Sequence, residues 1–186
     1  IVRELAGGEK LQDTKLHFVN CEPSSKLTVN SFFLSVCSPV MHKMLCGSFV
    51  ESIQKNIVLK DVDEKAFGKV LDMWCGKEVS ADMELGEVRE LARVADRFQM
   101  TDVASALEET VLNHLTMRMC ADVLNWSGEF GLRQLETAAW KLATEQFEEL
   151  VKTDGFMQMS EKVLGILLED DDLVARNEEA VWKAVA

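Results

Sequence analysis

The hydrophobic positions in the first part of the chain follow two periods, one typical of strands and one typical of helices. Residues 16–19 and 27–29 alternate in the manner of strands, and the turn sequence Glu22-Pro23-Ser24-Ser25 lies between them. This arrangement predicts a β-hairpin. Residues 56–59 (Asn-Ile-Val-Leu) predict a third strand, which ends at Lys60-Asp61.

Helical spacing surrounds these strands. Ile1 to Leu5 predicts a short amphipathic helix that ends at Gly7-Gly8, and Ser38-Pro39 suits the start of another helix. Asp63 is the expected N-cap of a helix over 64–74. The clearest apolar stripe, Leu85, Val88, Leu91, Val94 and Phe98, predicts the next helix, and Thr101-Asp102 precedes one that runs to 115.

The strand pattern disappears after Thr116. Apolar residues recur at helical spacing from Met119 onward, with breaks at Gly131, Gly155 and the run Asp170-Asp171-Asp172. We therefore expect an α+β domain at residues 1–116, with a small sheet covered by helices, followed by an all-α array of helices at residues 117–186.

The charge of the chain disfavours several classes of partner. The formal net charge is −12, with 13 basic and 18 acidic residues in 1–116 and 7 and 14 in 117–186. A negative surface repels phosphate backbones, so nucleic-acid binding is not expected. The N-terminal segment is too short and too acidic for a secretory signal, and no run is long enough for a membrane span. We expect protein partners.

Residues that carry chemistry are scattered. Five cysteines and three histidines form no metal-ligand spacing, and a disulfide framework is not predicted. Buried thiols in a reducing compartment are the favoured interpretation. The acidic run 170–172 lacks the spacing of a calcium loop. We predict no catalytic residues, no metal and no cofactor; an enzyme of the ubiquitin pathway would need a reactive thiol at Cys21, Cys46 or Cys75.

Several motifs in the first part resemble a BTB/POZ domain. They are Leu11-Gln12-Asp13 before a strand, Leu27 to Leu34, Ser38-Pro39-Val40-Met41, Ile57 to Val62 with Ala66-Phe67, Met73 to Val79, and Leu91 to Met100. The order and spacing of these motifs carry the resemblance, which implies the BTB/POZ fold for residues 1–116.

The second part resembles the BACK domain that follows BTB in kelch-like proteins. The residues that carry this resemblance are Cys120 to Leu124, Phe130-Gly131-Leu132, Ala138-Ala139, Phe147, Leu168 to Leu173 and Glu178 to Val181. Further helices are expected in such a domain, so we expect the BACK region at 117–186 to be truncated.

The resemblance implies a dimeric adaptor of a cullin-3 ubiquitin ligase, with a substrate protein held by a domain outside this chain. Such adaptors contact the N-terminal region of cullin-3 through a hydrophobic-x-Glu motif, which Phe49-Val50-Glu51 matches. An exposed apolar anchor beside a carboxylate suits such a contact. Alternatively, Phe49 packs on its own domain and Glu51 is solvated.

The resemblance also implies a second cullin-facing surface and a dimer interface. The second surface would include Asp96, Phe98, Gln99 and Met100, although a core position for Phe98 is the stronger interpretation. The dimer interface would include Ile1, Val2 and Leu5, because a lone short amphipathic helix is only marginally stable. Intramolecular packing of the same helix is the alternative.

One departure from the family pattern bears on function. Many BTB proteins carry His and a basic residue where this chain has Asn30-Ser31, and in BTB transcription factors that basic residue and the aspartate matching Asp13 form a corepressor pocket. Loss of the cation disfavours corepressor binding, while Asn30 still serves the fold. A transcriptional or architectural regulator that dimerises without a cullin remains the rival hypothesis. The expected location is the cytoplasm, with the nucleus as a second compartment.

Overall fold

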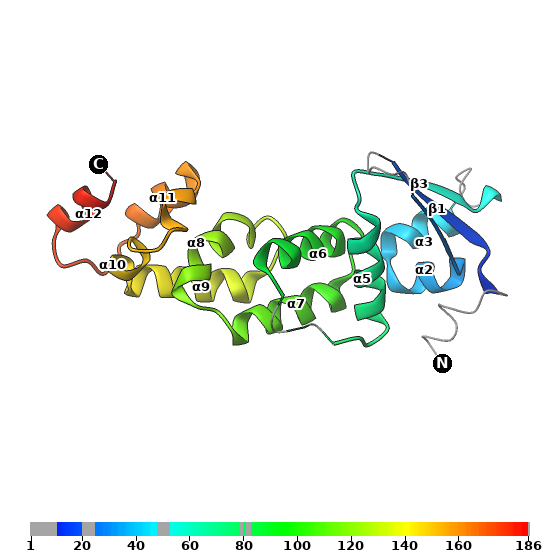
Figure 1. The fold of residues 1–186 in the computed structure, drawn as a ribbon, viewed down its shortest axis with the longest axis horizontal. Coiled ribbons are helices and arrows are strands. Elements are labelled where there is room, and N and C mark those ends of the chain that lie inside the picture. Colours follow the sequence, from blue (N-terminus) through cyan, green and yellow to red (C-terminus); the bar gives the residue numbers. More distant parts are fainter. Residues whose placement is uncertain (1–10, 20–24, 48–52, 79, 81–82, 186) are drawn as a thin grey trace. The chain divides into compact units, whose positions relative to one another are not determined.

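The structure is a computed structural model that describes residues 11–19, 25–47, 53–78, 80 and 83–185. The chain divides into two compact units, the first from residues 1–79 and 86–104 and the second from residues 80–85 and 105–186. Figure 1 shows the elements in chain order. The predicted helix at Ile1 to Leu5 lies outside the described residues.

The first unit contains a three-stranded sheet in the order β2-β1-β3. The predicted hairpin is confirmed, because β1 (Thr14–Val19) pairs antiparallel with β2 (Ser25–Val29). The third strand is also confirmed as β3 (Asn56–Lys60), and it pairs parallel with β1. The inward side chains Leu16, Phe18, Ile57 and Leu59 are buried, as the alternating pattern requires.

Two short helices lie between β2 and β3, and Figure 1 draws them together against the sheet. The first, α2 (Ser31–Cys37), begins at Asn30, whose side chain accepts a hydrogen bond from Phe33 N. The second, α3 (Pro39–Cys46), begins at Ser38, whose hydroxyl accepts from Met41 N. Proline at the first helical position suits this start because its missing N–H would have no partner there.

Three longer helices follow. The predicted N-cap of α5 (Glu64–Trp74) is confirmed, because Asp63 accepts a hydrogen bond from Ala66 N. Next come α6 (Leu85–Arg97) and α7 (Thr101–Asn113). Aromatic rings join the sheet to the helices: Phe67 packs 5.7 Å from Phe18 and 5.1 Å from Phe98 between ring centroids.

The regular elements among the described residues of the second unit are all helices. Its elements are α8 (Met117–Trp126), α9 (Arg133–Glu145), α10 (Phe147–Leu150), the 3-10 helix η2 (Phe156–Gln158), α11 (Glu161–Leu168) and α12 (Glu178–Val185). Trp126, Leu135 and Phe147 are buried in its core. This agrees with the predicted all-α second part, while the exact domain boundary at 116/117 stays a prediction.

Candidate interaction surface

The turn between α6 and α7 has a defined backbone geometry. Gln99 has φ +54°, which lies in the left-handed region. Its N–H donates to Asp96 O at 2.9 Å, and Met100 N donates to Ala95 O at 2.8 Å. This pair of bonds is a Schellman motif, in which the left-handed position is usually glycine. A glutamine there is strained by roughly 1 kcal/mol, and strain of this kind is found at functional turns.

Phe98 and Met100, on either side of Gln99, point into the first unit. Their exposed fractions are 1% and 2%. The Phe98 ring meets Phe67 edge-on, at an interplanar angle of 77°. Both residues belong to the predicted second cullin-facing surface, and their burial corrects that prediction because a core side chain is inaccessible to a partner. The Schellman turn is the physical reason, since its hydrophobic residue after the left-handed position packs back onto the helix.

A buried hydroxyl fixes the same turn. Ser38 is 1% exposed, and its Oγ donates to Phe98 O at 2.7 Å. The same oxygen accepts from Met41 N at 3.1 Å, so it caps α3 and holds the turn after α6 in one place. This leaves Asp96 and Gln99 as the exposed residues of the predicted second surface.

The other predicted contact residues lie outside the described part of the chain. These are Phe49, Val50 and Glu51 for the cullin contact and Ile1, Val2 and Leu5 for the dimer. Ile53, which follows the motif closely, is described and is 83% exposed. The predicted roles of these residues stay predictions.

Asp13, Asn30 and Ser31 take part in hydrogen bonds that join the segment before β1 to the start of α2. The Ser31 hydroxyl donates to Asp13 Oδ2 at 2.6 Å, and the Ser31 N–H donates to Asp13 Oδ1 at 2.7 Å. Asn30 Nδ2 donates to Leu11 O at 2.6 Å, while its Oδ1 caps α2. The carboxylate at Asp13 is therefore held by neutral donors from the start of α2, and Asn30 ties the preceding segment to the same helix.

The pKa of Asp13 is lowered from its ordinary value. Burial alone raises the pKa of this carboxyl, but the hydrogen bonds from the side chain and backbone of Ser31 and from Thr14, together with the charge of Lys55, outweigh that effect. A carboxylate that accepts several hydrogen bonds is stabilised in its charged form. These hydrogen bonds therefore favour the ionised form of Asp13.

Two cysteine thiols are poorly suited to nucleophilic chemistry. Burial raises the pKa of Cys37 to about 12 and that of Cys120 to about 11. The thiolate is the reactive form, so both thiols are inert at neutral pH. Cys46 is exposed and Cys75 is half-buried, while Cys21 lies outside the described residues.

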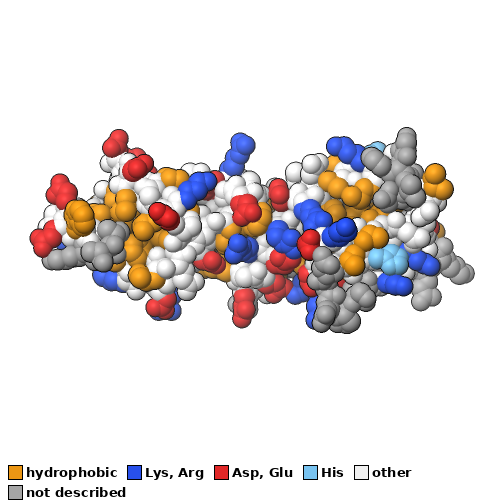
Figure 2. Space-filling view, turned by 90° about the horizontal axis from the view of Figure 1, so that it is seen from above, with side chains coloured by type: hydrophobic (Ala, Val, Ile, Leu, Met, Phe, Trp, Pro, Cys, Tyr) orange, Lys and Arg blue, Asp and Glu red, His pale blue; other side chains and the backbone are white. Residues whose placement is uncertain are grey.

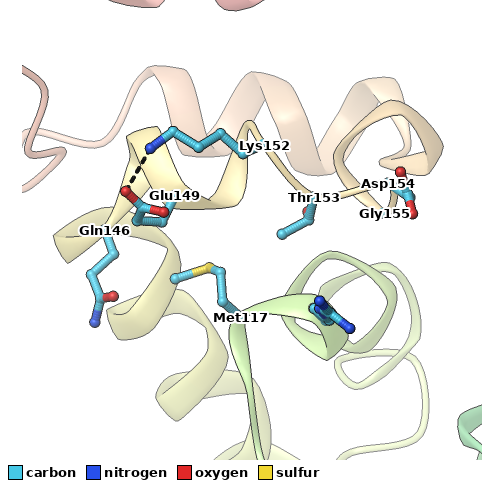
Figure 3. Close-up of a pocket in the computed structure, with 8 residues that line it drawn as sticks. Met117, Gln146, Glu149, Lys152, Thr153, Asp154 and Gly155 are labelled. Atoms are coloured by element: carbon cyan, nitrogen blue, oxygen red, sulfur yellow. Dashed lines mark hydrogen bonds and ion pairs between the residues drawn. The ribbon is translucent and has the colours of Figure 1, made fainter.

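The second unit contains an open cleft of about 660 Å³, which Figure 3 shows in close-up. Lys152 and Glu149 face each other across one side of it, with 2.7 Å between Nζ and Oε1. The Thr153 hydroxyl donates a hydrogen bond to the backbone oxygen of Leu150. The lining residues are Met117, Arg118, Gln146, Glu149, Lys152, Thr153, Asp154 and Gly155. This mixed lining lacks a nucleophile paired with a base.

The surface carries charges of both signs. In Figure 2, acidic side chains are spread among basic ones over the face that is drawn. Within the described residues, no group of three or more His, Cys, Asp or Glu side chains could hold a metal ion. No helix in the described part of the chain has the length and apolar character needed to cross a membrane.

Two sets of hydrogen bonds in this region were not predicted from the sequence. The buried bond from Ser38 to Phe98 O joins residues far apart in the chain, and only the Ser-Pro helix start marked Ser38 as structural. The two bonds from Ser31 to Asp13 also escaped prediction. Comparison with the family pattern indicates only that Ser31 lacks the usual positive charge. It does not indicate that the Ser31 hydroxyl donates a hydrogen bond to Asp13.

Comparisons with known proteins identify the class of protein that has this fold. A sequence model described as BTB/POZ domain matches residues 3–115, and one described as BTB And C-terminal Kelch matches residues 120–186. The chain belongs to the BTB/POZ domain family and continues into a BACK region.

The chain is also similar to several curated relatives. It is 27% identical to Kelch-like protein 41 of Homo sapiens over 96% of this chain and 30% of that protein. It is 26% identical to Kelch-like protein 30 of Homo sapiens over 82% of this chain and 26% of that protein. For Kelch-like protein 17 of Homo sapiens the identity is 26%, over 87% of this chain and 25% of that protein. The chain thus spans less than a third of the length of these relatives.

Proposed function

We propose that this chain is the scaffold part of a dimeric substrate adaptor for a cullin-3 ubiquitin ligase. The observation that carries the proposal is the domain pair, because BTB followed by BACK occupies the chain and its relatives are Kelch-like proteins. The chain supplies binding surfaces, and a region outside it holds the substrate protein. We propose that the chain acts in the cytoplasm, with the nucleus as a second compartment.

The proposed cullin contact combines the motif Phe49-Val50-Glu51 with the exposed side chains of Asp96 and Gln99. Phe49 acts as the apolar anchor, and the carboxylates of Glu51 and Asp96 orient the partner at the rim. The strained backbone at Gln99 supports a functional role, because glycine would fit that position better in a purely structural turn.

The test is titration calorimetry with the N-terminal region of cullin-3. We expect Phe49→Ala with Glu51→Ala to abolish binding while the dimer persists. Lys65→Ala with Glu64→Ala, on the first turn of α5, is the matched control and should bind like the wild type. Unchanged affinity of the Phe49/Glu51 variant would refute the proposed contact, and no binding by the wild-type chain would refute the adaptor function.

Dimerisation through the first unit is the second part of the proposal. Two apolar side chains lie one turn apart on α2 and are largely exposed, Phe32 at 73% and Val36 at 55%. Leu11 is 45% exposed and is joined to the start of α2 through Asn30. Apolar side chains grouped in this way favour a self-complementary interface, to which Ile1, Val2 and Leu5 would add.

Sedimentation equilibrium measures the oligomeric state directly. We expect the wild type to be a dimer and Phe32→Gln with Val36→Gln to be largely monomeric. The control, Ile166→Gln on α11, removes an apolar side chain that is 48% exposed in the second unit and should leave the dimer unchanged. A monomeric wild-type chain would contradict the dimer.

The rival function, a transcriptional or architectural regulator that dimerises without a cullin, makes a different prediction for the same measurements. Such a chain dimerises but binds no cullin-3. A corepressor pocket of the charged type is disfavoured because Ser31 supplies hydrogen bonds to Asp13 where that pocket needs a cation.

A further inference from the structure

The outward face of the three-stranded sheet carries basic side chains and no acidic one. The register of the strands places eight outward side chains on one surface: Lys26 and Thr28 of β2, Lys15, His17 and Val19 of β1, and Asn56, Val58 and Lys60 of β3. We call these residues the basic sheet face. None of the eight is acidic, although the chain has a net charge of −12.

His17 occupies the centre of this face. It lies opposite Lys26 on β2 and opposite Val58 on β3. Lys15 precedes it by two positions on β1, and Lys60 lies diagonally across on β3. Neighbouring strands are about 4.8 Å apart and alternate residues about 6.7 Å apart, so the three lysines surround one small area.

The three lysines have no charge partner within the described residues. Lys15, Lys26 and Lys60 are exposed, and the ion pairs among described residues involve other lysines and arginines. The carboxylate before β1, Asp13, is committed to Ser31. Like charges gathered on adjacent strands repel one another, and an acidic partner would relieve that repulsion.

An apolar position lies within the same area. Val58 is 58% exposed in the middle of β3, although β-branched residues in strands usually pack against a neighbour. It offers an apolar contact framed by cations. A bound segment whose sheet-facing positions include both carboxylate and apolar side chains would match both features, because an extended chain presents every second side chain to a sheet.

We propose that the basic sheet face docks an acidic, extended segment of a partner protein, with Lys15, Lys26 and Lys60 contacting carboxylates and Val58 contacting an apolar side chain. Charge complementarity carries the inference. A protein segment fits better than nucleic acid. A duplex carries a phosphate charge about every 1.7 Å along its axis, and the net negative charge of the whole chain would repel so dense an array. The face shares no residue with the proposed cullin contact, so this inference goes beyond the proposed function.

Fluorescence anisotropy of the full 186-residue chain tests it. The probe is a fluorescein-labelled peptide with the repeat Glu-Ser-Val-Ser, so that Glu and Val share one side of the extended chain, and the matched peptide has Gln in place of Glu. We expect the Glu peptide to bind at low salt, to weaken strongly at about 0.5 M salt, and to bind more tightly than the Gln peptide.

The variant Lys15→Gln/Lys26→Gln/Lys60→Gln should weaken binding about tenfold, since each exposed ion pair contributes only a fraction of 1 kcal/mol. The control variant Lys43→Gln/Lys65→Gln/Arg89→Gln removes three other exposed cations from the first unit and should leave the affinity within about twofold. Circular dichroism of both variants checks that the fold is intact.

Three outcomes would overturn the proposal. Equal losses in the two variants would mean that overall charge governs binding. Tighter binding of a DNA duplex, lost on the Lys15/Lys26/Lys60 variant, would assign the face to nucleic acid. Self-association lost in that variant, without any peptide binding, would assign it to a second copy of the chain.

Discussion

Glu108 Oε1 accepts a hydrogen bond from Leu135 N at 3.0 Å, and the same oxygen accepts from Gln134 N at 2.7 Å. Glu108 is on α7 and only 8% exposed, while Gln134 and Leu135 are in the first turn of α9. The residue that precedes α9, Leu132, provides no side-chain cap. A carboxylate from another helix therefore performs the capping role, and its charge also suits the positive end of α9.

Loss of this distant cap should destabilise the second unit. We expect Glu108→Ala to lower the free energy of unfolding by about 1–3 kcal/mol, because two backbone donors lose their acceptor. Urea unfolding followed by circular dichroism measures the change. The neighbour Glu109 is exposed, and Glu109→Ala should stay within about 0.5 kcal/mol of the wild type. Equal effects of the two substitutions would show that the cap contributes nothing.

The left-handed conformation of Gln99 allows stability and binding to be separated. We expect Gln99→Gly to raise the free energy of unfolding by up to about 1 kcal/mol, because glycine adopts positive φ without strain. If Gln99 contacts cullin-3, the same substitution weakens binding measured by calorimetry. Gln99→Asn serves as the control for backbone strain, because asparagine also tolerates this region. Gain of stability with unchanged affinity would remove Gln99 from the contact.

The burial of Phe98 predicts a large loss of stability on truncation. We expect Phe98→Ala to cost about 3–5 kcal/mol, because it leaves a cavity beside Phe67. Asp96→Ala, two residues away on the exposed side, should change stability by less than about 0.5 kcal/mol. Urea midpoints give both values. A small effect at Phe98 would contradict its place in the core.

The Asp13–Ser31 pair predicts a pH dependence of stability. Because the pKa of Asp13 is lower in the folded chain, the unfolded chain binds more protons in acid, and stability is lost as pH falls through the folded pKa. Ser31→Ala should lower stability at pH 7 by less than about 1 kcal/mol, since the pair is exposed.

The difference between wild type and Ser31→Ala should shrink as the pH falls through the lowered pKa of folded Asp13, because the protonated carboxyl is a weaker acceptor for the Ser31 hydroxyl. Urea midpoints at neutral and acidic pH measure it, and a double-mutant cycle with Asp13→Asn isolates the pair. A constant difference across the pH range would show that the hydroxyl acts elsewhere.

The raised thiol pKa values predict a clear order of reactivity. In a chain with Cys21→Ser and Cys75→Ser, we expect Cys46 to react with Ellman's reagent at pH 8 while Cys37 and Cys120 stay unmodified until unfolding. Their pKa values of about 12 and about 11 leave a negligible thiolate fraction at that pH. Rapid modification of Cys37 or Cys120 in the folded chain would contradict their burial and raised pKa values.

The strands and most helices were predictable because local patterns determine them. The alternation in residues 16–19 and 27–29 identified the hairpin, and Asp63 identified the start of α5. The parallel pairing of β3 with β1 was not predictable from local sequence. It joins segments about forty residues apart and depends on the packing of the helices between them.

The candidate site was less predictable for a related reason. The apolar spacing that identified α6 included Phe98, but it did not show that Met100 folds back into the core through the Schellman turn. Nothing in the local sequence distinguishes Glu108 from the other carboxylates of the chain. The only local signal for its role was the absence of a capping side chain before α9, and such a gap does not reveal which residue fills it.

The order β2-β1-β3 also bears on how the first unit forms. The hairpin of β1 and β2 closes a short loop, whereas β3 must return across the length of α2 and α3 before it can add to β1. Pairing of strands that are distant in the sequence is slower than formation of a local hairpin, because more chain entropy is lost before the contacts form. Amides of β3 should therefore gain protection from hydrogen exchange after those of the hairpin during refolding. Pairing of β3 with β1 is then the last step in the formation of the sheet.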